Sequence, residues 1–225
     1  MNPKQTVVSL LIKTKTGEKF VSSQRYRTIL SAAAAFVFNL LYAFCHCVLG
    51  ILNLSLWFIA MCAFYGILAV MRFSAVLCER NHHKTSCDDM EIFVMRFSGV
   101  LLVALAIVLV AVNYISLSQN IAVKHEEILM ITIAAYIFYK ITMVIIKAVK
   151  QRADPSPLLR AIRNIGYAEV SASILTLQRS MLVSFGSMDN SKIHLMNSLT
   201  GAAVCIFILS LGLSMTAKSK RKEED

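Results

Sequence analysis

The sequence predicts an all-α integral membrane protein of six transmembrane helices, built as two three-helix repeats that enter the membrane from opposite faces. Three observations lead to this fold class. The 225 residues are 57% hydrophobic and their mean hydropathy is +0.64, which is more apolar surface than a soluble domain of this length can bury. The apolar residues come in long runs that do not alternate with polar ones, as in membrane helices. The two halves of the chain also share a weak internal similarity.

Six apolar runs are each long enough to cross a hydrocarbon core of about 30 Å. A basic N-terminal segment, residues 1–27, precedes them, and a charged tail, residues 218–225, follows them. Pro157 after Ser156 suits the start of the fifth helix, because proline needs no amide partner in a first turn and serine caps free amide groups. The predicted helices span residues 28–50, 51–77, 92–117, 127–148, 157–185 and 193–217.

Lysine and arginine are distributed unevenly between the two sides of the predicted bundle. With the N-terminus inside, nineteen of the twenty-three fall on the inner side and three on the outer, and Lys140 is left within the membrane. Cytoplasmic loops of membrane proteins carry such an excess, so both termini are predicted to be cytoplasmic, in the plasma membrane. The same rule accounts for the formal charge of +10, and we expect no nucleic-acid partner.

Residues 28–117 and 127–217 form the two predicted repeats. In an alignment of these halves, Arg72 matches Arg179 and Gly99 matches Gly201, which indicates a repeat of about one hundred residues. Three helices are an odd number, so the second copy starts from the opposite face of the membrane. Inverted repeats are common in transporters. The alternative is a duplication kept only for packing.

One charge stands inside each of two neighbouring apolar segments. Lys140 and Glu169 both lie about fourteen residues from the Asp154-Pro155 turn, so on two helices they reach the same depth, roughly 20 Å from the turn. A charge at the bilayer centre costs roughly 2.5–3.5 kcal/mol on insertion scales, and it is normally paired or faces water. The sequence therefore predicts a pair. It is either a permanent ion pair between the fourth and fifth helices or a solute site whose ligand breaks the pair.

Polar residues follow one face of the first, fourth and fifth predicted helices at steps of three and four residues, the spacing of a helical stripe. Each serine or threonine alone is explained by a hydrogen bond to its own helix backbone, but stripes on three helices together predict a shared cavity. The candidate residues for binding a substrate or ion are Asn39, His46, Tyr136, Lys140, Glu169, Ser173 and Thr176.

The matched arginines, Arg72 and Arg179, are predicted to lie at opposite membrane interfaces. There they would be snorkelling anchors or a symmetric pair of gate residues. The loop after the second helix holds weak candidate metal ligands whose spacing fits no standard zinc pattern, namely Cys78, His82, His83 and Cys87. We therefore predict no metal and no cofactor.

Enzymatic activity is not expected, because the chain has no nucleophile elbow, phosphate loop or paired-carboxylate site. The polar stripes and the inverted repeat favour a transporter that moves a small polar or charged solute or ion through a midplane site between the first, fourth and fifth helices. The alternatives are an ion-channel subunit and a non-transporting membrane partner or scaffold protein. We also expect a homo-oligomer in the lipid bilayer, since a bundle of 225 residues encloses little volume alone.

Overall fold

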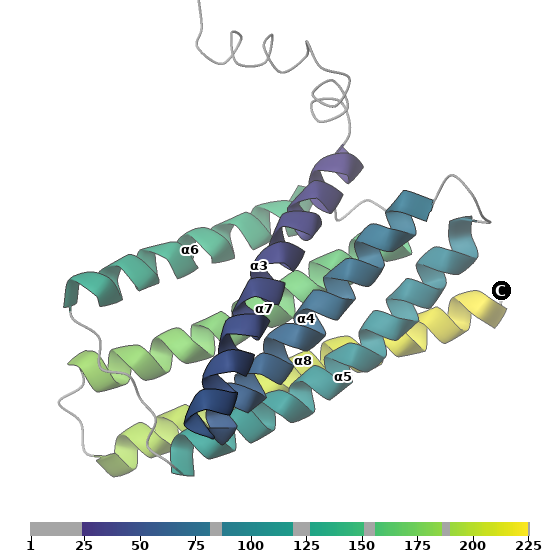
Figure 1. Cartoon of the computed structure of the whole chain (residues 1–225). Coiled ribbons are helices and arrows are strands. Elements are labelled where there is room, and N and C mark those ends of the chain that lie inside the picture. The colour runs from purple at the N-terminus through teal and green to yellow at the C-terminus, as the bar shows by residue number, and fades with distance from the viewer. Residues whose placement is uncertain (1–23, 82–86, 119–126, 151–155, 186–189, 225) are drawn as a thin grey trace, which may run out of the picture.

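The computed structural model describes residues 24–81, 87–118, 127–150, 156–185 and 190–224, and these form an all-α bundle (Figure 1). Its six helices are α3 (Gln24–Asn53), α4 (Leu56–Asn81), α5 (Cys87–Ser118), α6 (Glu127–Lys150), α7 (Pro157–Phe185) and α8 (Asn190–Glu224). Among the described residues the all-α fold and its six helices are confirmed, while the crossing of the membrane by all six stays a prediction. The largest difference in bounds is at the C-terminus, where the residues expected to form a separate charged tail continue α8 to Glu224. Lysine, arginine and glutamate are good helix formers, so the helix extends through them.

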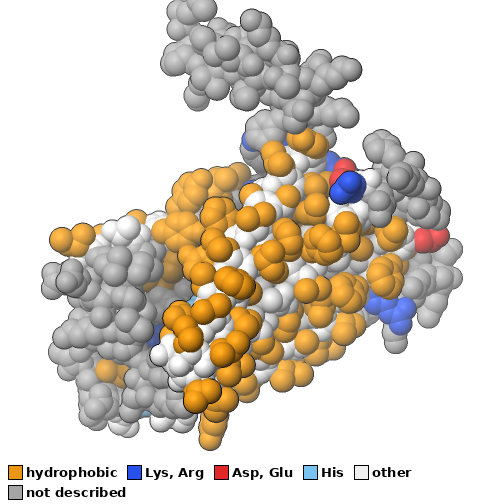
Figure 2. All heavy atoms as spheres, viewed as in Figure 1, with side chains coloured by type: hydrophobic (Ala, Val, Ile, Leu, Met, Phe, Trp, Pro, Cys, Tyr) orange, Lys and Arg blue, Asp and Glu red, His pale blue; other side chains and the backbone are white. Residues whose placement is uncertain are grey.

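Four of these helices, α3, α4, α5 and α8, are long and apolar enough to cross a membrane. They indicate a multi-pass membrane protein. The space-filling view agrees, because apolar side chains cover the face formed by α3, α4 and α5, while charged side chains gather near one end of the bundle (Figure 2). Phe38 and Leu41 of α3, for example, are 63% and 58% exposed, as side chains that face lipid would be.

Successive helices run in alternating directions, and α7 is the central one (Figure 1). Among the described residues the backbone of α7 lies close to all five other helices, whereas the backbone of α6 lies close to α7 alone. The strongest further pairings are α3 with α4 and α5 with α8. α6 is therefore held to the bundle mainly by its packing on α7, together with the hydrogen bond from Lys147 to Ser31 of α3.

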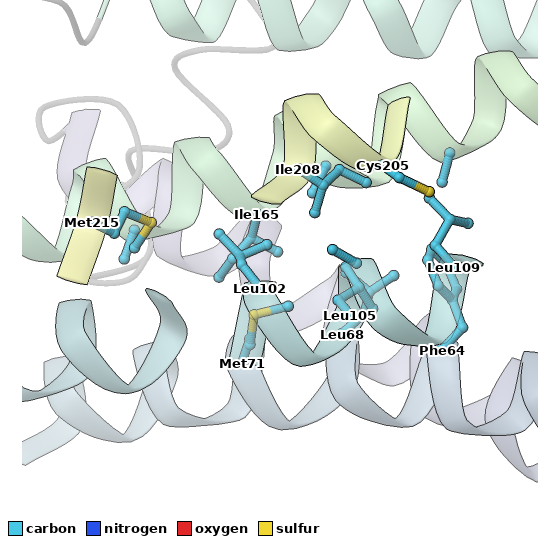
Figure 3. Packing of buried hydrophobic residues seen from close by; sticks show 14 of the residues in the cluster. Phe64, Leu68, Met71, Leu102, Leu105, Leu109, Ile165, Cys205, Ile208 and Met215 are labelled. Carbon is cyan, nitrogen blue, oxygen red and sulfur yellow. The ribbon is translucent and has the colours of Figure 1, made fainter. Parts of the chain in front are cut away.

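The apolar core lies between α4, α5, α7 and α8 (Figure 3). Its fully buried members include Leu68 and Met71 of α4, Leu102 of α5, Ile165 of α7 and Ile208 of α8. α6 contributes instead to a small separate cluster in which Ile137 packs on Leu177. In a membrane, van der Waals packing of this kind holds helices together, since lipid tails are as apolar as the side chains.

α5 and α8 approach closely at two glycines. A Cβ atom on Gly99 would lie 2.9 Å from Thr216, and one on Gly212 would lie 2.9 Å from the Gly99 carbonyl oxygen. Gly201, nearer the other end of α8, has no room for a Cβ either, because it would meet the Asn113 side chain. Small residues at such crossings let helix backbones pack directly.

A two-residue turn, Leu54 and Ser55, joins α3 to α4. The Ser55 amide donates to the Gly50 carbonyl at 3.2 Å, the long-range bond of a Schellman motif. Leu54 adopts a φ of 46°, a left-handed conformation that glycine tolerates better than leucine does. The hairpin of α3 and α4 is thus closed by a strained residue.

Candidate functional site

Glu169 of α7 holds two cations from two different helices. Its Oε1 lies 2.7 Å from Lys140 Nζ of α6, and its Oε2 accepts a hydrogen bond from Arg72 Nη2 of α4. Lys140 also donates to Ser173 Oγ at 3.2 Å, and that hydroxyl donates to the Glu169 carbonyl at 2.9 Å. Arg72, Lys140, Glu169 and Ser173 form what we call the central cluster.

The central cluster lies in the interior of the bundle. The side chains of Arg72, Glu169 and Lys140 are 9%, 15% and 23% exposed, and each residue stands well inside its helix. They lie beside the apolar core, on the side of the bundle where α6 packs. Groups buried in this way lose their hydration, and only their mutual attraction and hydrogen bonds offset that loss.

Positive charge exceeds negative charge at this site. Two cations share the single Glu169 carboxylate. Lys147, two turns further along α6 from Lys140, interacts electrostatically with both Arg72 and Glu169 and donates to Ser31 Oγ of α3 at 2.6 Å. Within the described structure the buried Nε of Arg72 has no hydrogen-bond partner. The site therefore has spare positive charge and a spare donor.

Aromatic side chains border the cluster on the side away from Lys147. Tyr65 of α4 stacks on Tyr42 and on His46 of α3, with ring centroids 5.3 and 5.6 Å apart. Tyr65 also lies within electrostatic range of Glu169 and of Tyr136 on α6. Tyr and His side chains of α3, α4 and α6 therefore lie next to the central cluster.

The predicted pairing of Lys140 with Glu169 is confirmed, and Ser173 joins it. Asn39 is buried with 4% exposure, and its side-chain nitrogen has no partner among the described residues. His46 and Tyr136 stand beside Tyr65, although Tyr136 is 62% exposed. Thr176 is not brought into the cluster, because its hydroxyl donates to Ala172 of its own helix at 3.0 Å. Their role in binding a solute stays a prediction.

Arg72 lies elsewhere than expected. A snorkelling anchor keeps its guanidinium in water, but this side chain is 9% exposed and paired with Glu169. The site thus includes α4, whereas the sequence predicts it between the first, fourth and fifth helices; a gate role for Arg72 stays a prediction. The signal was present: Arg72 stands nine residues before the end of α4 and Glu169 twelve after the start of α7, roughly 14 and 18 Å in.

Arg179, the matched arginine, binds a different kind of partner. Its Nη2 donates to Asn113 Oδ1 of α5 at 3.0 Å, and its side chain is partly buried. The candidate metal ligands His82 and His83 lie outside the described residues, and the Cys87 side chain does too. Within the described chain no three histidine, cysteine or acidic side chains come together at metal-binding distance.

A second ion cluster joins four helix ends. Arg25 of α3 lies 2.7 Å from Glu79 of α4 and 2.6 Å from Glu91 of α5. Ser156, just before α7, donates to Glu91 at 2.8 Å. Arg25, Glu79, Glu91 and Ser156 form what we call the end cluster. No local sequence pattern indicated these contacts, because they join segments far apart in the chain.

No protein-family model and no curated protein matches this sequence. No residue role is therefore carried over from a relative. What the central cluster does has to be inferred from its own geometry, charge and position in the bundle.

Proposed function

We propose that the protein is a multi-pass membrane transporter that moves a small polar or charged solute or ion through the central cluster. The carrying observation is that Glu169, on the helix that contacts all others, holds Lys140 of a peripheral helix and Arg72 of a core helix at once. Buried charges in membrane helices mark solute and ion pathways more often than packing sites.

The attachment of α6 supports this reading over a permanent ion pair. Among the described helices the backbone of α6 packs on α7 alone, through the apolar pair Ile137 and Leu177 and the polar contacts of Lys140. Among the described residues α3 and α6 make no backbone contact, and Lys147 reaches across to Ser31. A solute that competes for Glu169 or Lys140 would loosen α6 from the rest of the bundle. Transporters need such a coupling between binding and helix movement.

The proposal includes an inverted repeat, and the helix contacts support it in part. The pairs α3–α4 and α4–α5 correspond to α6–α7 and α7–α8. The matched glycines Gly99 and Gly201 both stand at close approaches of α5 to α8. At the arginines the halves differ, since Arg72 binds a carboxylate and Arg179 an amide. Two halves with similar helix contacts but different side chains can enclose one binding site between them.

The proposal also includes membrane crossing by all six helices, with both termini cytoplasmic in the plasma membrane. The excess of basic residues supports this orientation. A homo-oligomer is expected as well, because a bundle of 225 residues encloses little volume alone. We propose no enzymatic activity.

Uptake by the purified protein in proteoliposomes tests the proposal. We expect saturable uptake of one class of solute, and loss of that uptake in the double variant Lys140→Met with Glu169→Gln. Normal assembly and full uptake in this variant would show that the pair is only structural. Single-channel current without saturation would favour a channel subunit. A fixed co-purifying protein with no uptake of any solute would favour a scaffold.

A further inference from the structure

We propose that the solute is a small soluble oxyanion, of the carboxylate, phosphate or sulfate type, and that Glu169 occupies its place when the site is empty. This inference rests on the proposed transport function and names the substrate class for the same site. Three features of the described residues lead to it: an excess of cations, unused hydrogen-bond donors and a carboxylate that can be displaced.

The excess of cations favours an anion over a cation or a neutral solute. Arg72 and Lys140 share Glu169, with Lys147 within electrostatic range. Binding a further cation would add to the repulsion among these groups. Binding one anion balances the second cation of the pair. In a site this buried, charge balance dominates binding because screening by water is weak.

The unused group on Arg72 is a donor, and the ionised oxygens of an oxyanion accept hydrogen bonds. Arg72 places one Nη on Glu169 and leaves its buried Nε–H without a partner in the described structure. A guanidinium binds carboxylate and phosphate with two parallel N–H groups, and Lys cannot reproduce that fork. The free Nε therefore marks where an oxyanion would complete the geometry of this arginine.

Asn39 supplies a second unused donor at the same level of the bundle. Its Nδ2 is buried without a partner among the described residues. On α3 it stands between Phe36, which packs on Phe73, and Tyr42, which stacks on Tyr65. Asn39 is therefore level with the turn of α4 that leads into Arg72. This second buried donor near the depth of Arg72 agrees with a ligand that accepts hydrogen bonds.

Glu169 is itself an oxyanion held by the chain. A solute must take over Arg72 or Lys140 from it, so the carboxylate acts as an internal competitor. Removing its charge by Glu169→Gln should raise the affinity for the solute. A purely structural ion pair predicts the reverse, a weakened bundle with no response to anions. The sign of this one effect separates the two explanations.

The experiment measures binding by the purified full chain in a neutral detergent. The probes are inorganic phosphate, sulfate and acetate, with choline and glycerol as cationic and neutral controls. We expect one of the oxyanions to raise the unfolding temperature in a saturable way. In Glu169→Gln its Kd should fall about tenfold or more, and in Lys140→Met and Arg72→Gln it should rise about tenfold or more.

The end cluster supplies matched control variants. Glu91→Gln and Arg25→Gln remove a buried carboxylate and its arginine partner away from the site, and we expect both to leave the Kd for the oxyanion unchanged. If Arg72→Gln fails to fold, Arg72→Lys keeps the charge but lacks the fork, and its Kd should still rise. An equal change of Kd in Glu91→Gln and Glu169→Gln would overturn the inference, since the effect would not be local.

Two further results would overturn the inference and leave transport standing. One is uptake of a cation or a neutral solute that depends on Glu169, with no oxyanion bound by either wild type or Glu169→Gln. The other is stabilisation by phosphatidylglycerol dispersed in the detergent micelles but by none of the small oxyanions, which would assign the site to a lipid headgroup. Oxyanion binding without uptake of any solute would sustain the anion site and reject the transport function.

Discussion

The two ion clusters of this protein have opposite ratios of cations to carboxylates. At the end cluster one arginine lies between two carboxylates, Glu79 and Glu91. Glu91 also accepts from Ser156 and from the Leu158 amide at the start of α7, where the helix dipole favours negative charge. At the central cluster one carboxylate lies between two cations, and a guanidinium nitrogen has no partner among the described residues.

The difference indicates two roles. The end cluster is satisfied: each charge has partners, and it joins α3, α4, α5 and the start of α7 into one fixed end. The central cluster keeps spare charge and a spare donor, in contact with the helix that has the fewest neighbours. A satisfied cluster stabilises one conformation, whereas an incomplete one can be completed by a ligand.

Loss of Lys140 should separate function from stability most strongly. Lys140→Met leaves the pair of Arg72 with Glu169 intact and removes a long amine from the edge of the core. We expect uptake in proteoliposomes to fall by about tenfold or more, while the unfolding free energy falls by less than about 3 kcal/mol, the loss when a buried charge is left unpaired, because Glu169 keeps Arg72. Uptake near the wild-type level would place Lys140 among structural residues and cancel the contrast between the clusters.

Loss of Glu91 should do the reverse. Glu91→Gln leaves Arg25 with only the more exposed Glu79, and breaking a buried pair costs about 3 kcal/mol or more, or about 6–12 °C in unfolding temperature for a chain of this size. Thermal unfolding in detergent measures it. Glu79→Gln is the control, because its side chain is 27% exposed, and it should cost about 1 kcal/mol or less.

A packing variant tests whether the central effects are only a loosened bundle. Gly212→Ala places a methyl group against the Gly99 carbonyl, and we expect it to cost about 1–3 kcal/mol. The Kd for the solute should not change, since no charge is touched. Gly66→Ala is the matched control: nothing lies within 4 Å of its Cβ position. It should be neutral or stabilise its helix by up to about 1 kcal/mol.

The smallest expected effect is a gain in stability far from both clusters. Leu54 has a φ of 46° and is 87% exposed, so Leu54→Gly relieves strain and should stabilise the α3–α4 turn by about 0.5–1 kcal/mol. Thermal unfolding checks this. Uptake should not follow the gain; a parallel rise would mean that activity reflects general stability and not the central cluster.

Much of the architecture was predictable because long apolar runs leave a chain few choices. Lipid requires that backbone groups be bonded within the segment, so run length alone predicted six helices, and Pro157 marked the start of α7. Counting residues from one turn also placed Lys140 level with Glu169. The C-terminal tail was missed, since a polar sequence near a membrane end continues a helix as readily as it ends one.

Arg72 and the end cluster depended on the tertiary structure. Position along one helix gives a depth, but it does not say which neighbouring helix faces a side chain, and Arg72 had an equally plausible depth near the interface. The contacts of Arg25 with Glu79 and Glu91 span 54 and 66 residues, beyond any local pattern. The sequence by itself determined the class of protein, its helices and one charged pair, because these follow from depth and hydropathy. Packing around α7 alone decided that this pair is a cluster with an unused donor, because lateral contacts depend on how helices rotate against each other.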